Sequence, residues 1–155
     1  MAERRPKIVI GADHGGFTLK DKIKKFLEKE GYKVEDVGTY SSEPCDYPRF
    51  AYEAAKKVSG RKTQKGILIC KTGTGMAVVA NKLSGVRAGV CLSKADAKSA
   101  RQHNDTNVLV LAATKTSPGK TRGIVRTWLR TKALKGRHAR RVRQIKELEK
   151  RKGAA

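Results

Sequence analysis

Cysteine is scarce in this chain of 155 residues, which has only Cys45, Cys70 and Cys91. An odd number at irregular spacing disfavours both a disulfide scaffold and a zinc ribbon, and it indicates a reducing compartment such as the cytoplasm. Long apolar runs are lacking too. The chain contains no run of about 18 apolar residues, which a membrane-spanning helix would need. The first residues lack the apolar stretch of a signal peptide. We therefore expect a cytoplasmic protein with no membrane partner.

Acidic and aromatic residues are also few. The chain has 36 Lys and Arg against 14 Asp and Glu, a formal net charge of +22. Residues 1–60 carry twelve basic and ten acidic side chains, whereas residues 61–155 carry twenty-four and four. This asymmetry predicts an anionic partner for the second half, whether a phosphorylated metabolite, nucleic acid or counterions. Aromatics make up 5% of the chain, so the stacking platforms of single-strand-binding proteins are lacking. Nonspecific affinity for polyanions follows from charge alone.

Strand-like and helix-like segments alternate along the chain, with no internal repeat and no low-complexity linker. Short apolar, β-branched runs predict strands at residues 7–12, 32–37, 66–70, 86–91 and 107–112. Helical spacing of apolar residues predicts helices at 17–30, 50–58, 76–82, 94–103 and from 117, then a basic C-terminal helix at 136–152 and a frayed tail at 153–155. The alternation predicts one α/β domain over residues 1–155, a Rossmann-like three-layer α/β/α sandwich on a five-stranded parallel sheet. In such folds the ligand site lies beyond the carboxyl ends of the strands.

The strongest candidate site follows the third predicted strand. Residues 67–76 read ILICKTGTGM, an apolar run that ends at Cys70 before a glycine-rich turn and a helix. Such a turn directs unpaired backbone N–H groups at one spot, where the helix dipole also favours negative charge. A thiol beside it has its thiolate form stabilised. The turn is neither a Walker motif nor a dinucleotide motif. The alternatives are a plain tight turn and a cysteine that merely fills space.

Three further groups of polar residues are candidates. Asp13 and His14 follow the first predicted strand; the alternative is an Asp that caps the next helix and an exposed loop His. His103 and Asn104 lie at a helix end, where dipole compensation and turn formation are the alternatives. Arg137 and Arg141 would share one helical face and clamp a phosphate. The alternative for these two is a solvated basic helix, because residues 130–152 contain eleven Lys and Arg.

Several motifs occur together and in order along residues 7–145: Gly11-Ala-Asp-His-Gly-Gly-Phe, Gly38-Thr-Tyr with Asp46-Tyr-Pro, Gly66-Ile-Leu-Ile-Cys-Lys-Thr-Gly-Thr-Gly-Met, Ala80-Asn-Lys, Arg101-Gln-His-Asn-Asp-Thr-Asn and Gly136-Arg-His-x-x-Arg. They closely resemble the ribose-5-phosphate isomerase B family, which also contains galactose-6-phosphate and allose-6-phosphate isomerases. The resemblance implies interconversion of phosphorylated aldoses and ketoses, ribose and ribulose 5-phosphates first, without metal or other cofactor. It also implies homodimers or homotetramers whose active sites are shared between subunits. The alternatives are a hexose 6-phosphate substrate and a basic nucleic-acid-binding protein on the same scaffold.

The resemblance also implies a role for each candidate residue. Cys70 resembles the base that moves a proton between C1 and C2 through an enediolate. The turn formed by Lys71, Thr72, Gly73, Thr74 and Gly75 resembles the family's cradle for the enediolate oxygens, with Thr72 contributing its hydroxyl. His103 resembles the residue that opens the sugar ring, with Asp13 opposite. The family's phosphate ligands correspond to His14, Arg137 and Arg141. Asn104 resembles a further substrate contact.

Two positions depart from the pattern of many family members. Lys71 stands where many have glycine, so its side chain is expected to narrow the site or contact the phosphate. Thr114-Lys115 stands where many place an arginine near the phosphate. Lys115 would act there as a point charge without the bidentate fork of arginine. A shift in substrate preference is therefore expected to arise at these positions.

Overall fold

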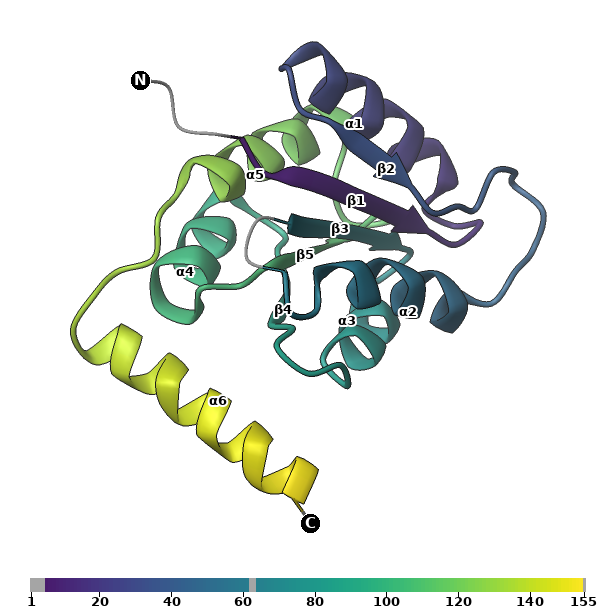
Figure 1. Ribbon diagram of the computed structural model, residues 1–155. Coiled ribbons are helices and arrows are strands. Elements are labelled where there is room, and N and C mark those ends of the chain that lie inside the picture. Colours follow the sequence, from purple (N-terminus) through teal and green to yellow (C-terminus); the bar gives the residue numbers. More distant parts are fainter. Residues whose placement is uncertain (1–4, 62–63, 155) are drawn as a thin grey trace.

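The computed structural model describes residues 5–61 and 64–154, which form five strands and six helices (Figure 1). The strands are β1 (Lys7–Ala12), β2 (Val34–Asp36), β3 (Gln64–Cys70), β4 (Ala88–Val90) and β5 (Val108–Ala112). The helices are α1 (Phe17–Lys29), α2 (Tyr47–Val58), α3 (Thr74–Ala80), α4 (Lys94–Asn104), α5 (Pro118–Arg130) and α6 (Arg137–Ala154).

The five strands form one parallel sheet in the order β2-β1-β3-β5-β4. The register aligns the carboxyl ends of the three central strands, because Ala12 pairs with Ile69 and Cys70 pairs with Ala112. The central strands are buried on both faces, which explains why β1, β3 and β5 read as continuous apolar runs. The predicted five-stranded parallel sheet is confirmed.

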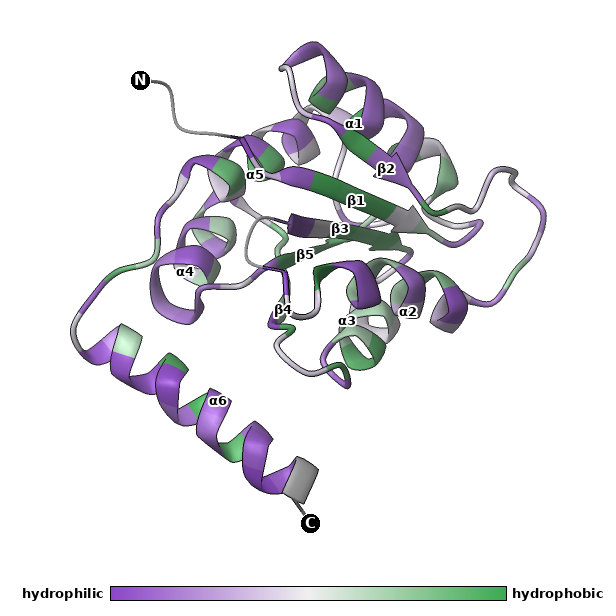
Figure 2. Cartoon of the chain, viewed as in Figure 1, coloured by the Kyte–Doolittle hydropathy of each residue, from purple (hydrophilic) through white to green (hydrophobic). Residues whose placement is uncertain are grey.

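Helices cover both faces of the sheet and complete the three layers. Helices α1, α4 and α5 pack on one face, around a core that includes Ile23, Leu109 and Trp128. Helices α2 and α3 pack on the other, around Phe50, Leu68 and Met76. Figure 2 shows the apolar strands of the sheet enclosed by helices that are polar on their outer sides. The predicted sandwich is confirmed.

Several elements begin or end away from their predicted bounds. Helix α2 begins at Tyr47, three residues before its predicted start, because Pro48 is favourable in a first helical turn. Helix α3 begins inside the glycine motif at Thr74. Strands β2 and β4 have three residues each and lie at the two edges of the sheet, where short strands limit unwanted pairing.

Helix α6 lies apart from the sheet (Figure 1). It packs along α4, where Val142 is buried, and Glu149 Oε1 accepts a hydrogen bond of 2.7 Å from the Gly85 N–H. It continues to Ala154, two residues past the predicted end of the helix. None of the described helices is long and apolar enough to cross a membrane.

A fully buried lysine fixes the loop after β2. Lys20 Nζ lies 2.6 Å from Asp36 Oδ1 and donates a hydrogen bond of 2.7 Å to the Thr39 carbonyl. The Thr39 N–H in turn donates to the Ala12 carbonyl at 2.7 Å. The loop is therefore held against the carboxyl end of β1, beside the candidate site.

Candidate functional site

We call the region beyond the carboxyl ends of β1 and β3 the crevice, because open α/β sheets bind their ligands there. These strands are neighbours, but β1 continues into α1 on one face and β3 into α3 on the other. Their loops diverge, which is the arrangement that creates ligand sites in open α/β sheets. Since Ala12 pairs with Ile69, the next residues, Asp13 and Cys70, emerge side by side. The structure thus brings together the two predicted groups that follow the first and third strands.

Cys70 faces the turn that follows it. The Gly73 N–H donates a hydrogen bond of 3.1 Å to Cys70 Sγ. Gly73 has a φ of 84°, and this left-handed conformation lets the turn fold back over the sulfur. Cys70 is 5% exposed, so the thiol is more covered than its predicted place at the rim of the turn. A side chain this covered reacts only with a ligand that enters the crevice.

Cys91 offers a contrast within the same chain. It is 1% exposed, and burial, followed by the Asp96 carboxylate, raises its pKa to about 12. The Cys91 thiol therefore stays protonated at neutral pH. It lies just beyond edge strand β4, away from β1.

Lys71 lies between the loops that follow β1 and β5. A Cβ atom placed on Gly15 would lie only 2.6 Å from Lys71 Cγ, so the lysine stem packs directly on that glycine. The Lys71 carbonyl accepts two hydrogen bonds from Thr114, one from its N–H at 3.1 Å and one from its hydroxyl at 2.7 Å. The long side chain therefore lies against the loop that carries Asp13 and His14, while its backbone is tied to the loop that follows β5.

Tyr47 belongs to this site although it was not among the predicted site residues. A Cβ atom on Gly75 would come within 2.5 Å of the Tyr47 ring, so the first turn of α2 packs on the glycine turn. Asp46-Tyr-Pro was noted as a motif, but nothing in the spacing linked residue 47 to residue 75. The signal lay in the pairing of a glycine with a distant aromatic, which depends on how α2 and α3 pack.

Asp13 and His14 are held by backbone contacts. Asp13 is 8% exposed, and its Oδ1 accepts a hydrogen bond of 3.2 Å from the Gly16 N–H, which shapes the loop before α1. His14 Nδ1 lies 3.1 Å from both the backbone N and the O of Cys45. With Nδ1 engaged in this way, His14 Nε2 is the ring nitrogen left for a ligand. Thr72 and Thr74 are exposed in the turn beside them.

The remaining candidates lie at the opposite end of the sheet, near the amino ends of its strands. Helix α4 runs back from the carboxyl end of β4 and ends just before β5 begins at Val108, which pairs with Gly66 near the start of β3. The His103 ring stacks on His138 of α6, with ring centroids 4.3 Å apart. The single chain therefore separates the predicted site into two groups. One is Asp13, His14 and residues 70–75; the other is His103, Asn104, Arg137 and Arg141.

The second group forms an exposed cationic end. Arg137 and Arg141 are exposed on the first turns of α6. Loss of water around its ring lowers the pKa of His138, and the neighbouring His103, Arg137 and Arg141 lower it further. His138 is therefore neutral at pH 7, and the two arginines carry the charge with which this end could hold an anion. Among the described residues, no group of three or more His, Cys, Asp and Glu side chains is placed to hold a metal ion.

The family model for Ribose/Galactose Isomerase matches residues 8–145. The chain belongs to this family. Ribose-5-phosphate isomerase B of Escherichia coli (strain K12) is 44% identical over 146 residues, which are 94% of this chain and 98% of that protein. The predicted resemblance is confirmed.

Solved structures of the family have the same fold. Ribose-5-phosphate isomerase B of Clostridium thermocellum superposes with a TM-score of 0.91 at 45% identity, covering 94% of this chain and 98% of that one. The Mycoplasma genitalium enzyme, solved with bound ribulose 5-phosphate, gives 0.90 at 39% identity, covering 93% and 96%.

Proposed function

We propose that this chain interconverts ribose 5-phosphate and ribulose 5-phosphate by proton transfer through an enediolate. Its family membership supports the reaction class, and the names of its relatives support the sugar. The observation that carries the proposal is the position of the Cys70 sulfur. It accepts a hydrogen bond from the Gly73 N–H, and Cys70 lies next to Asp13 at the carboxyl end of the sheet. The Lys71 stem packed on Gly15 takes up space beside the loop that carries Asp13, which supports a pentose over a longer hexose.

In the proposed reaction the Cys70 thiolate takes the proton from C2 of the open-chain aldose. The electron pair left on C2 forms the C1–C2 double bond, and the carbonyl oxygen gains the negative charge. Backbone N–H groups of the turn other than that of Gly73, together with the Thr72 hydroxyl, stabilise this oxygen, and one such donor typically lowers the barrier by about 3 kcal/mol. Cys70 then returns the proton to C1, and the proton of the C2 hydroxyl passes to the C1 oxygen, so that C2 becomes the ketone and C1 carries the hydroxyl. Orientation by the distant phosphate supplies the remaining gain in rate.

The site needs a second copy of the chain. The side chains proposed for ring opening and for the phosphate, His103, Arg137 and Arg141, lie at the amino end of the sheet, whereas Cys70 lies at its carboxyl end. We therefore propose a homodimer, or a homotetramer built from such dimers, in which one subunit supplies Cys70 and its partner supplies these three side chains. Apolar side chains left exposed near α6 support such an interface, since Val90, Ile145 and Leu148 are 36%, 44% and 59% exposed.

A cysteine pair tests the proposed base. Cys70→Ala is expected to lower kcat for ribose 5-phosphate by about 10²- to 10⁴-fold, the range for loss of a general base. Cys91→Ala is the matched control, because this thiol is buried and protonated, and it should keep the parent's turnover. Isomerisation can be followed by the absorbance of the ketose product, with circular dichroism to verify folding. Parental turnover in Cys70→Ala would show that the sulfur is not the base.

A further inference from the structure

A second hollow lies at the amino end of the sheet, between the sheet and α6. It encloses about 660 Å³ and is lined by the end of α2, the start of β3, the connections before β4 and β5, and the middle of α6. We call it the amino-end hollow. Its polar lining consists of Arg61, Gln64, Lys65, Ser84, Arg87, Asp105, Asn107, Lys146, Glu149 and Lys150. None of the residues proposed for isomerisation lines it.

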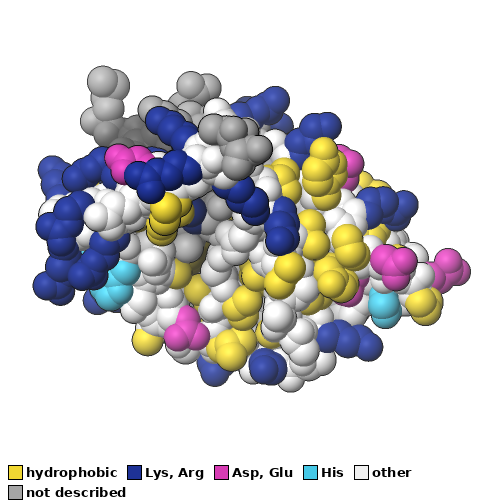
Figure 3. All heavy atoms as spheres, turned by 90° about the horizontal axis from the view of Figure 1, so that it is seen from below, with side chains coloured by type: hydrophobic (Ala, Val, Ile, Leu, Met, Phe, Trp, Pro, Cys, Tyr) yellow, Lys and Arg dark blue, Asp and Glu magenta, His cyan; other side chains and the backbone are white. Residues whose placement is uncertain are grey.

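The amino-end hollow is strongly cationic. Five Lys and Arg side chains line it against two carboxylates. Both carboxylates are already engaged: Asp105 lies 2.9 Å from Arg101 and 3.4 Å from Arg87, and Glu149 accepts the Gly85 N–H. Within the described part of the chain, the other four cations form no ion pair: Arg61, Lys65, Lys146 and Lys150. Figure 3, a view of the molecule from below, shows Lys and Arg side chains gathered mainly along its left side.

Two residues at the start of β3 show that the hollow is more than an exposed basic surface. Lys65 is largely covered, and burial, followed by the charge of Arg101, lowers its pKa to about 8. Its Nζ lies 5.6 Å from the centre of the Trp128 ring. Beside it, Gln64 Oε1 is buried without a hydrogen-bond partner in the described structure. A half-turn of that amide would present NH₂ donors in place of the oxygen. A bound anion would compensate the Lys65 charge and give the amide a partner.

We propose that the amino-end hollow binds a small molecule that carries two or more phosphate groups. Lys65 and Gln64 form its floor, and Lys146 and Lys150 hold the ligand from α6. The volume suits one small ligand, since such pockets span about 300–1,000 Å³. A nucleic-acid strand fits less well, because the hollow is closed on one side by α6 and its lining contains no aromatic ring on which bases could stack. The proposal stands independently of the isomerase assignment.

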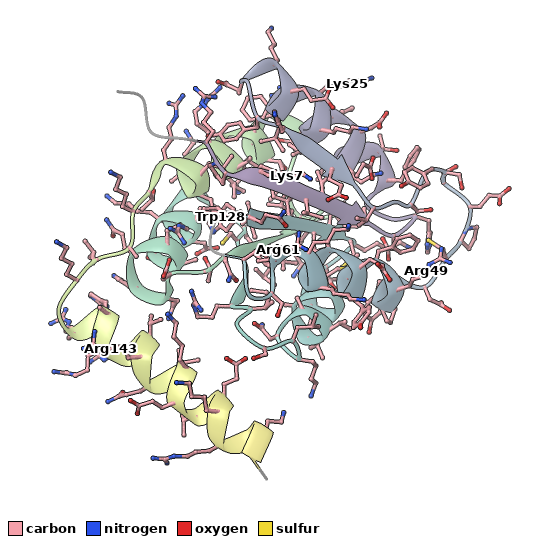
Figure 4. All side chains as sticks on the ribbon, in the orientation of Figure 1. Lys7, Lys25, Arg49, Arg61, Trp128 and Arg143 are labelled. Carbon is pink, nitrogen blue, oxygen red and sulfur yellow. The ribbon has the colours of Figure 1, made fainter. Side chains whose placement is uncertain are left out.

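Inorganic pyrophosphate is a suitable probe, and Trp128 is a built-in reporter because it is the only tryptophan. Figure 4 labels Trp128 and Arg61 near the start of β3. Titration of the protein with pyrophosphate at constant ionic strength should change Trp128 fluorescence to saturation, with one site per chain by calorimetry. The double variant Lys146→Ala/Lys150→Ala should weaken binding at least about tenfold, as expected for loss of two charge-assisted contacts. Lys65→Met should weaken it similarly, and both variants should keep the parent's isomerase turnover.

Two controls separate this site from general charge and from the sugar-phosphate site. Lys22→Ala/Lys25→Ala removes the same charge from exposed positions on α1, at the far end of the molecule from α6 (Figure 4), and should leave the affinity for pyrophosphate unchanged. His14→Ala, in the crevice, should leave the Trp128 response unchanged. The proposal fails if no saturable response occurs, if the α1 variant weakens binding equally, or if His14→Ala abolishes the response. It also fails if oligonucleotides bind through Lys146 and Lys150 with an affinity that rises with length beyond that of pyrophosphate.

Discussion

The lysine at position 71 adds a charge to the mouth of the crevice. Its stem packs on Gly15, and its backbone is fixed by Thr114. The ammonium group therefore extends from a fixed point at the edge of the loop that carries Asp13 and His14. A cation there adds to the attraction for a phosphorylated substrate, and as an exposed point charge it acts through distance rather than through paired hydrogen bonds.

Removal of the Lys71 charge should weaken substrate binding more than it slows chemistry. Lys71→Met keeps the apolar stem on Gly15 and is expected to raise KM for ribose 5-phosphate about five- to tenfold, since hydrogen bonds to charged groups contribute about 1.5–3 kcal/mol and an exposed one less. Lys71→Arg should restore KM. Steady-state kinetics on the three proteins provide the measurement, and an unchanged KM in Lys71→Met would place the ammonium away from the substrate.

Much of this site was accessible from the sequence because its parts are local. Cys70 and the turn after it are contiguous in sequence. Asp13 and His14 directly follow a strand, and any parallel sheet brings the carboxyl ends of its strands to the same end. Tyr47 was missed because its contact with Gly75 depends on the packing of two helices. The burial of Lys20 was equally hidden, since its partners Asp36 and Thr39 meet it only after β2 pairs with β1.

Among the elements, α6 has the fewest ties to the rest of the fold. Its buried contact is Val142, and its first turn is joined to α4 by the stacked rings of His103 and His138. The sequence predicted this helix within a few residues from its apolar spacing. Its position was not predictable, because the stack joins two histidines that are 35 positions apart in the chain.

Acidification should loosen α6 at this stack. The pKa of His138 is lowered from 6.5 in the folded chain, so the unfolded chain binds more protons as the pH falls below 6.5. The contribution of the neutral ring is therefore complete above pH 6.5 and is lost as the pH falls through the lowered value. Proton NMR should give His138 a pKa below 6.5, and hydrogen exchange in the first turns of α6 should be faster at pH 5 than at pH 7.

Two variants separate the stack from general charge effects. In His103→Ala the pKa of His138 should rise toward 6.5, because the neighbouring imidazole contributes to its depression. His14→Ala, at the carboxyl end of the sheet, should leave the His138 titration unchanged. A His138 that titrates at 6.5 or above in the parent protein would contradict the predicted coupling.

At the scale of the whole molecule, the main consequence of the fold is that the candidate site residues are divided between the carboxyl end and the amino end of the sheet. The alternation of strands and helices predicted the architecture, which the structure confirms. The separation of His103 from Cys70 followed only once α4 was seen to return to the amino end of the sheet. A chain arranged in this way is expected to be inactive as a monomer.

Mixing two inactive variants should restore activity if sites are shared. Cys70→Ala lacks the proposed base and His103→Ala lacks the imidazole proposed for ring opening, so each alone should have little turnover. After unfolding and refolding together in equal amounts, half of the dimers pair one subunit of each kind. Each such dimer contains one site with both residues intact, so the mixture should regain about a quarter of the parent's activity. Absence of recovery, with mixed dimers verified by mass spectrometry, would show that each subunit carries its own complete site.

The two hydrogen bonds from Thr114 to the Lys71 carbonyl have a bearing on how this enzyme could be redesigned. They are accepted by the backbone carbonyl oxygen of residue 71, which is present whatever the side chain at that position. Exchange of the side chain at 71 or 115 would therefore leave the donors of the turn in place. Tuning for a larger or smaller sugar can then proceed at these positions while the machinery for moving the proton stays untouched.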